Sequence, residues 1–484
     1  MLGVSIMQTQ KSAPEIQAYV DVKSNFTDYS YFQDSTARRA ESQRAFIHGS
    51  AYEPDYLYPK LDRLYDTVEG KTTLAERKRD TYEAILELEA NKGSGVISDE
   101  EYEFYAGGHE MRLKKMMLVE AAKRLREAGN SQAVQTARQE FMQLNHEIYG
   151  EIDEAVFGAM MATESRRVAN FIPADERTRN IQQQLLRYFD MHEFQGEEAE
   201  LLTNSELIAI QKELHRRFGK ELEEFPDTPD DVYYDATQCA EIMNRAINAD
   251  GFDGGKWKFE VSHEISIVST HVAKKRIYLP ATTRRNAAEL RRLYLHERGV
   301  HADRSVKGEA TGVRLLKYGT AANADVEEGE GVLRECAEAG TMDNPSINRA
   351  RDRYIVAGLA LGADGQPKDG RQTYEMMWRL LAVKYAEDGF ITEAVEARAK
   401  KEATVHDDNA FRGTNWAMPG VIYSKLKVYY EGIMKDAAYY RQAIADDRLS
   451  EAMDDSNIGK IDHTNPQELA FAKRIIAKQQ AVAA

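Results

Sequence analysis

The chain has 484 residues, of which 42% are hydrophobic and 30% are charged, as is typical of a globular protein with a sizeable core. With 64 Lys and Arg against 80 Asp and Glu, its formal charge is −16, which argues against nucleic acid or an anionic membrane as the main partner. It has only two cysteines, no leader-like start and no apolar run of membrane-spanning length. We therefore expect a cytoplasmic protein without disulfide bonds.

Residues 1–55 are predicted to form an irregular arm and residues 56–170 a helical subdomain. The arm mixes Ser, Gln, Asp and Tyr without a helical period, and three aromatic residues are expected to pack it on the body: Tyr29, Tyr31 and Phe32. Helix starts are indicated by two pairs with capping-box spacing: Thr73 with Glu76, and Ser98 with Glu101. One buried stripe is predicted from apolar residues three or four apart: Phe141, Leu144, Ile148, Ile152, Ala155 and Ala159. An intramolecular bundle is favoured over a coiled coil that binds a partner.

Residues 171–450 are predicted to form the main domain, followed by a C-terminal tail or helix at 451–484. Helical stretches come first, and one helix should begin at Thr203 with Glu206 in its capping box and end at Gly219. Alternating apolar residues then predict three short strands with hairpin-like connections: Trp257, Phe259, Val261, Ile265, Ile267, Ile277 and Leu279. We therefore predict an α+β fold, mainly α, with a small antiparallel sheet.

The segment that is most informative about chemistry follows these strands. His296, Glu297 and His301 form a His-Glu-x-x-x-His motif, one residue longer than the His-Glu-x-x-His of zinc proteases. Residues five apart on a regular helix are separated by about 140° round the axis, so they cannot chelate one ion. A π-bulge or an early helix end is needed, and Gly299 between the histidines would tolerate either.

With that distortion, His296 and His301 supply two imidazole ligands and Glu297 points at the reacting water. Zinc is the default metal, because a catalytic zinc site uses three N or O ligands and keeps one open position. The third ligand is expected on a helix near residue 330. Glu328 is preferred because it shares a face with apolar residues, whereas Glu327 lies on a polar face that is expected to point away from the interior.

A chance match on a charged helix is the alternative interpretation of the motif. Two further His-Glu pairs, His109-Glu110 and His263-Glu264, have no correctly spaced partner and show how common the fragment is. The order of strands, helix, motif and a later carboxylate favours a site.

These residues lie in a context that resembles the tyrosine/phenylalanine carboxypeptidase domain family, which includes microtubule-associated tyrosine carboxypeptidases that trim α-tubulin. The resemblance covers roughly residues 180–445. It rests on three separated motifs in the family's order: Leu295-His296-Glu297-x-Gly299-Val300-His301-x-x-Arg304-Ser305, Glu327-Glu328-Gly329, and Arg412-Gly413-Thr414 followed by Pro419-Gly420, Tyr429 and Gly432. The chain departs from the family pattern at four positions: Arg298, Glu330, Gly331 and Leu426.

The resemblance implies a gluzincin-like metallopeptidase core that binds one Zn²⁺ ion. His296, His301 and Glu328 would be its ligands, and Glu297 the catalytic acid/base. The chain would then be a hydrolase, a metalloprotease that removes a C-terminal Tyr or Phe from a peptide or protein.

A carboxypeptidase must also bind the terminal carboxylate of its substrate. Arg412 is the first candidate, because a guanidinium group binds a carboxylate through two hydrogen bonds, and Lys425 and Arg304 are further candidates. Tyr429 is a candidate to orient the substrate or to stabilise an oxyanion. Each of these residues is explained equally well by an ordinary ion pair or by packing.

Two other functions remain open. One is a zinc endopeptidase or aminopeptidase with the same ligands, and the other is a catalytically inactive metal-binding or scaffold protein that acts through residues 55–170. The expected partner is a peptide or protein C-terminal tail, with neither nucleic acid nor a membrane. Tubulin is not inferred as substrate, because an acidic protein would repel an acidic tail. The sequence specifies neither the physiological substrate nor the oligomeric state.

Overall fold

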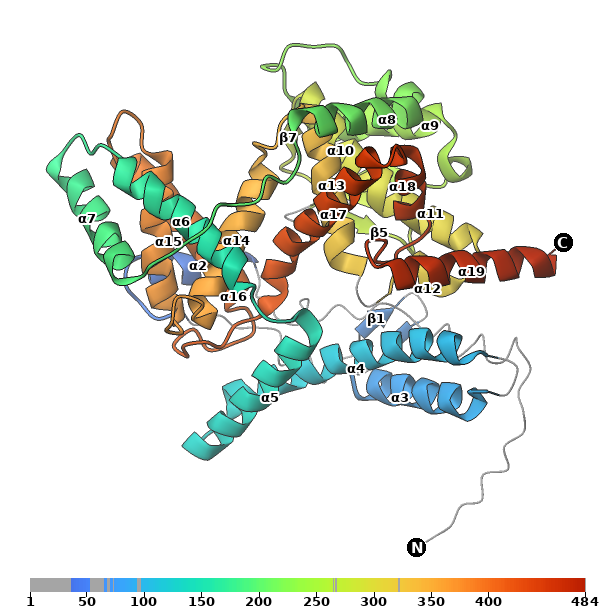
Figure 1. Ribbon diagram of the computed structural model, residues 1–484, viewed down its shortest axis with the longest axis horizontal. Coiled ribbons are helices and arrows are strands. Elements are labelled where there is room, and N and C mark those ends of the chain that lie inside the picture. Colours follow the sequence, from blue (N-terminus) through green and yellow to red (C-terminus); the bar gives the residue numbers. More distant parts are fainter. Residues whose placement is uncertain are drawn as a thin grey trace, which may run out of the picture. The chain divides into compact units, whose positions relative to one another are not determined.

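The computed structural model describes residues 36–52, 65–67, 70–72, 74–93, 97–263, 265, 268–320 and 323–483. Helices dominate these residues and the strands are short (Figure 1). The mainly helical class is therefore confirmed. Within this part of the chain, no helix is both long and apolar enough to cross a membrane.

The described residues divide into two compact units. The first contains the residues from 36 to 199 and Arg349–Val428. Its elements are α2 (Thr36–Ile47), β1 (Tyr65–Thr67), β2 (Gly70–Thr72), α3 (Leu74–Asn91), α4 (Asp99–Glu127), α5 (Ser131–Tyr149), α6 (Glu154–Asn170), α7 (Glu176–Met191), most of α14 (Pro345–Leu361), α15 (Gly370–Tyr385), α16 (Glu393–Ala410) and the 3-10 helix η5 (Ser424–Lys427).

Part of the predicted irregular arm is a helix, which corrects the prediction. Helix α2 lies within it, and Phe46 and Tyr52 are buried in an aromatic cluster with Trp416. The helix was missed because its sequence is mostly polar and lacks a periodic apolar stripe. The three aromatic residues expected to pack the arm (Tyr29, Tyr31 and Phe32) lie outside the described residues.

The apolar stripe predicted from Phe141 to Ala159 is also wrong as one continuous helix face. Gly150, at φ 71°, ends α5, and the side chain of Asp153 caps the start of α6. Ala155 is consequently exposed, although Phe141 is fully buried. The capping box at Ser98 and Glu101 is confirmed at the start of α4. The other predicted pair includes Thr73, which is outside the described residues.

The second unit contains Glu200–Asn348 and the residues from 429 to 483. Its elements are α8 (Asn204–Leu222), β3 (Tyr234–Asp235), α9 (Ala236–Ala249), the 3-10 helix η3 (Phe252–Gly255), β4 (Lys258–Ser262), β5 (Ser269–His271), β6 (Arg276–Pro280), β7 (Arg284–Arg285), α10 (Ala287–His296), the π-helix η4 (Glu297–Ala302), α11 (Asp303–Ala310), α12 (Arg314–Tyr318), α13 (Asn323–Ala339), most of α17 (Val428–Ala445), α18 (Leu449–Ser456) and α19 (Pro466–Ala483).

The three-stranded sheet of this unit has the order β4-β6-β5. β5 and β6 are antiparallel, but β4 and β6 run parallel, with Phe259 opposite Ile277. The prediction of an antiparallel sheet is therefore wrong for β4. The reason is that alternation of apolar residues shows which face is buried but not which strands are neighbours. Ile265 lies outside any strand, and Ile267 is outside the described residues.

The core of the second unit holds α10 against this sheet. Phe259 of β4 stacks on Tyr294 of α10, with 6.0 Å between ring centroids, and Ile277 and Leu290 are fully buried in the same cluster. Helix α8 has the start predicted at Thr203, and it kinks at Phe218 (φ −113°, ψ 15°), directly before the predicted stop at Gly219, and then continues to Leu222.

Candidate metal centre

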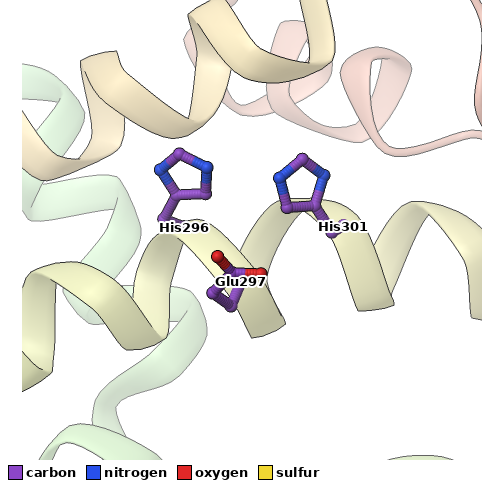
Figure 2. Close-up of side chains that lie close together, drawn as sticks. All are labelled: His296, Glu297 and His301. Carbon is purple, nitrogen blue, oxygen red and sulfur yellow. The ribbon is translucent and has the colours of Figure 1, made fainter. Parts of the chain in front are cut away.

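The helix that carries the motif changes its winding at the motif itself. Asn286 and Glu289 form a capping box at the start of α10, which ends at His296, and Glu297–Ala302 continue as a π-helix. The wider turn places His296 and His301 on the same side of the helix, and Figure 2 shows both rings projecting there. The distortion predicted from the spacing of the two histidines is thus confirmed.

Close packing explains why glycine stands inside the π-helix. A Cβ atom on Gly299 would lie 3.2 Å from Nη1 of Arg334 and 3.4 Å from Cζ of Phe218. The same Arg334 nitrogen donates to the carbonyl oxygen of Gly299 at 2.5 Å. A π-bulge disturbs the regular hydrogen bonding of a helix, so this side-chain donor satisfies a carbonyl at the distorted turn.

Each histidine of the motif has one ring nitrogen held by a carboxylate. Nδ1 of His296 lies 2.7 Å from Oε1 of Glu335, and Nδ1 of His301 lies 2.7 Å from Oε1 of Glu327. When Nδ1 carries the proton and donates it to a carboxylate, Nε2 presents its lone pair. Carboxylate partners of this kind orient metal-binding imidazoles and make them more basic.

The carboxylate of Glu328 lies near both Nε2 atoms. Its Oε2 is 4.0 Å from Nε2 of His296, and its Oε1 is 4.0 Å from Nε2 of His301. Zinc lies about 2.0–2.2 Å from its N and O ligands, so two ligands of one ion are at most about 4.3 Å apart. The Glu328 side chain is 40% exposed, which leaves it room to adjust. Both 4.0 Å separations fall within this limit, so they are compatible with Glu328 as a third ligand beside the two histidines.

The motif alone also forms a group that could hold a metal. Ligand atoms of His296, Glu297 and His301 all lie within 4.8 Å of one another. Glu297 is buried, and its Oε2 accepts a hydrogen bond of 2.7 Å from Oγ1 of Thr270 on β5. Burial lowers the pKa of His296, but the hydrogen bond to Glu335 and the surrounding carboxylates raise it to about 10, so a metal ion would displace the proton on Nε2 as it binds.

Gly331, one of the departures from the family pattern, makes room for a ligand ring. A Cβ atom at this position of α13 would lie 2.7 Å from both Nε2 and Cε1 of His296. Any side chain there would push the imidazole out of its place, because such contacts are far inside van der Waals distance. The departure is thus compatible with a metal centre.

Glu330, a second departure, is paired inside the protein and is fully buried. It pairs with Arg334 and accepts hydrogen bonds from Oη of Tyr440 at 2.8 Å and Oγ of Ser456 at 2.7 Å. Burial raises its pKa, but the charges of Arg334 and Arg304 lower it to about 2. The additional acid is therefore compensated.

Arg298, where the family has an aliphatic residue, fills a core position. Its guanidinium group lies 3.9 Å from the ring centroid of Phe252, and its Nη2 donates to Oε1 of Glu221 at 2.8 Å. The side chain is buried, so stacking and ion pairing replace aliphatic packing here.

The polar face of α13 is buried as well, which corrects the expectation that it points away from the interior. Glu327 is 4% exposed and Arg334 is 1% exposed. Besides His301, Glu327 pairs with Nζ of Lys460 and accepts from Nδ2 of Asn323 at 2.7 Å. The expectation failed because burial was inferred from the apolar residues of each face alone. Charged residues can also be buried when they are paired, and the pairing of this face is not visible in the sequence.

Three residues of this arrangement were missed in the sequence. Glu335 lies two helical turns after Glu328, so it shares the face of that residue, and this spacing was a usable signal. Thr270 and Lys460 give no such signal, because their contacts join residues 27 and 133 positions apart.

The residues predicted to bind substrate lie in both units. Arg304 is fully buried, and its Nε donates to the carbonyl oxygen of Gly459 at 3.0 Å. Tyr429 stands in α17 of the second unit. Arg412 and Lys425 belong to the first unit, where Nη2 of Arg412 donates to Oδ1 of Asn409 at 2.6 Å. The substrate-binding role of these four residues stays a prediction.

Comparison with known protein families gives a match. Residues 162–361 match the family model described as microtubule-associated tyrosine carboxypeptidase, MATCAP. The matched stretch includes the π-helix and α13, and therefore both histidines and Glu328. No curated protein and no solved structure matches the chain.

Proposed function

Because residues 162–361 form a domain of the microtubule-associated tyrosine carboxypeptidase family, we propose that this chain is a zinc-dependent metallocarboxypeptidase with a gluzincin-like core. It removes a C-terminal Tyr or Phe from a peptide or protein. The observation that carries the proposal is the pair of 4.0 Å distances from the Nε2 atoms of His296 and His301 to the carboxylate of Glu328.

In this proposal His296, His301 and Glu328 hold one Zn²⁺ ion. When bound, the ion supplies a Lewis acid that polarises the scissile carbonyl and makes water more acidic. Glu335 and Glu327 keep each imidazole in the tautomer whose Nε2 is free, because each accepts the proton carried by Nδ1.

Glu297 acts as the general acid/base. It takes a proton from the attacking water as the bond from water oxygen to carbonyl carbon forms, and it delivers a proton to the leaving amine nitrogen as the C–N bond breaks. Thr270 holds Oε2 of the carboxylate by its 2.7 Å hydrogen bond, which supports Oε1 as the atom that exchanges protons.

The free C-terminal carboxylate of the substrate needs a cationic partner. Arg412, Lys425 and Tyr429 remain our candidates for substrate binding. Arg304 is a weaker one, since a substrate would have to displace the backbone carbonyls that its buried guanidinium already binds. Among the described strands β5 stands at one end of the order β4-β6-β5, and we propose that its outer edge pairs with an extended peptide.

The substrate class that we propose is a C-terminal tail ending in Tyr or Phe. The name of the family adds microtubule association, which supports a cytoplasmic location. We do not extend the substrate to tubulin, because the net charge of −16 would repel an acidic tail.

Paired peptides test the reaction type. Purified protein with zinc is incubated with a peptide that ends in Tyr. The peptide is supplied in two forms, one with a free and one with an amidated C-terminus. The masses of the products are measured by mass spectrometry. Loss of one Tyr from the free form alone is the expected result. Internal cleavage of both forms would identify an endopeptidase, and loss of the first residue an aminopeptidase. Either outcome would overturn the proposed carboxypeptidase.

A further inference from the structure

We propose that Lys460, which lies beyond the matched family domain, is a positioning residue that fixes the His301 ring of the metal centre through Glu327. The inference rests on the proposed function in one respect, because it takes His301 as a zinc ligand. It adds that a loop of the C-terminal segment completes the centre.

Lys460 contacts Glu327 directly. Nζ of Lys460 pairs with Oε1 of Glu327, the same oxygen that lies 2.7 Å from Nδ1 of His301. The other oxygen, Oε2, accepts from Nδ2 of Asn323 at 2.7 Å. With both oxygens held, the carboxylate cannot rotate, so it defines the plane and direction of the imidazole.

Burial makes this contact strong. The side chains of Lys460 and Glu327 are 11% and 5% exposed. A charge pair that is shielded from water interacts more strongly than a surface pair, and removal of one partner leaves the other charge uncompensated. Glu327 therefore depends on Lys460 for its place.

The backbone around Lys460 is held as firmly as its side chain. Its N–H donates to the carbonyl oxygen of Leu316 at 2.7 Å, and its own carbonyl accepts from the N–H of Thr320 at 3.0 Å. The preceding Gly459 approaches so closely that a Cβ atom there would lie 2.9 Å from Cβ of Leu316. The loop thus presents Nζ of Lys460 at a defined position.

Arg304 links the same loop to the helix of the motif. It follows His301 by three residues, and its guanidinium group donates to the carbonyl oxygens of Gly459 and Ile461, which flank Lys460. The loop is therefore connected to the region around His301 at two points. One is Arg304, three residues after His301, and the other is the contact of Lys460 with Glu327, the hydrogen-bond partner of His301. This arrangement gives the buried Arg304 a positioning role.

Lys460→Met in the full-length chain tests the inference, because methionine keeps much of the volume of the side chain and removes its charge. We expect the zinc affinity, measured by competition with a chelator, to fall by at most about 10–100-fold, the effect of losing the hydrogen-bond partner of a ligand, because Lys460 acts on Glu327 and not on His301 itself. The visible absorption of the cobalt-substituted protein should change too, since the orientation of a ligand ring changes. Lys460→Arg, which keeps the charge, should restore most of the affinity.

Lys384→Met is the matched control. Lys384 is also mostly buried, with 18% of its side chain exposed, and it pairs with Asp352 at 3.0 Å in the first unit. Lys384→Met should lower the stability of the fold, because it breaks a buried ion pair. It should keep the zinc affinity of the native chain. Equal zinc affinity in the native chain and in folded Lys460→Met would overturn the inference.

The route through Glu327 is tested by a double substitution. In a Glu327→Gln background, Lys460→Met should have little further effect on zinc affinity, and additive effects would contradict the proposed route. If Lys460→Met does not fold, Lys460→Gln keeps a hydrogen-bond donor without the charge, and unchanged affinity in that variant would overturn the inference. A native chain that binds no zinc would instead overturn the proposed function together with the inference.

Discussion

The two ring nitrogens of each histidine in the motif have different tasks. Nδ1 is held by a carboxylate, and Nε2 faces Glu328. This division helps to explain how four glutamate side chains can lie near two histidines despite the repulsion between their negative charges: Glu297, Glu327, Glu328 and Glu335. Glu297, Glu327 and Glu335 each lie within hydrogen-bond distance of a side-chain donor, and Glu328 is the proposed metal ligand.

Thr270 should affect turnover and leave metal binding alone. Its hydroxyl is a donor to Oε2 of Glu297, and a hydrogen bond to a charged group is worth about 1.5–3 kcal/mol. Thr270→Val should therefore lower kcat/KM by at least about tenfold. Thr270→Ser keeps the hydroxyl and should keep most of the activity. Steady-state kinetics with zinc content measured in parallel checks this, and an unaltered kcat/KM in Thr270→Val would exclude a role for the hydroxyl.

Gly331→Ala should weaken zinc binding by displacing the ring of His296, because the new Cβ atom would lie 2.7 Å from Nε2. Gly219→Ala in α8 is the control, since a Cβ atom there meets nothing within 4 Å. The control should keep the zinc affinity of the native chain. Isothermal titration with zinc and chemical unfolding of both variants test the pair. Native affinity in Gly331→Ala would show that His296 is not held where the structure has it.

Local signals predicted the helix starts and the change of winding. Capping boxes at Ser98 and Thr203 depend on residues three positions apart, and the His-Glu-x-x-x-His spacing requires a distorted turn if both imidazoles bind one ion. Non-local features could not be predicted. The parallel pairing of β4 with β6 and the contact of Lys460 with Glu327 depend on how distant segments meet, which a periodic pattern does not specify.

Helices α8 and α18 are joined by an ion cluster that should make stability depend on pH. Glu213 accepts from Arg216 and Arg217, and Nη1 of Arg217 donates to Oδ1 of Asp454 at 2.6 Å. The hydrogen bond from Arg216 lowers the pKa of Glu213 from 4.5 to about 2, against the opposing effect of burial.

The sign of the effect follows from this lowered pKa. A carboxylate with a lower pKa in the folded state stabilises the protein above its unfolded pKa and loses that contribution as the pH falls toward its folded pKa. At pH 7 the free energy of unfolding should therefore be larger for the native protein than for Glu213→Gln. This difference should shrink as the pH is lowered from about 4.5 to about 2. Urea unfolding over this range measures it. A difference independent of pH would rule out the charge of Glu213 as its cause.

The C-terminal segment belongs to the same unit as the candidate centre, although it lies outside the matched family domain. Ser456 and Lys460 contact Glu330 and Glu327 of α13, and Phe471 of α19 is buried. The sequence suggested only a tail or helix from residue 451 onward. The predicted domain limits near residues 55, 170 and 450 stay predictions.

Removal of zinc should destabilise the native chain, because an ion that binds only the folded state adds stability. The contribution is about 2.7 kcal/mol when free zinc is one hundred times its dissociation constant. A chelator should therefore lower the Tm in calorimetry, and added zinc should restore it. Glu328→Gln, which lacks one proposed ligand, should respond less. The same Tm with and without chelator would contradict a resident zinc ion.

The most direct test of the account compares native protein with Glu297→Gln, both loaded with zinc to the same measured content. Each is incubated with peptides that differ only in a terminal Tyr, Phe, Glu or Lys, and the products are weighed by mass spectrometry. We predict that the native chain releases the terminal Tyr or Phe and that Glu297→Gln, with its metal in place, releases neither. Release by both proteins at equal rates would contradict the assignment of catalysis to the π-helix centre.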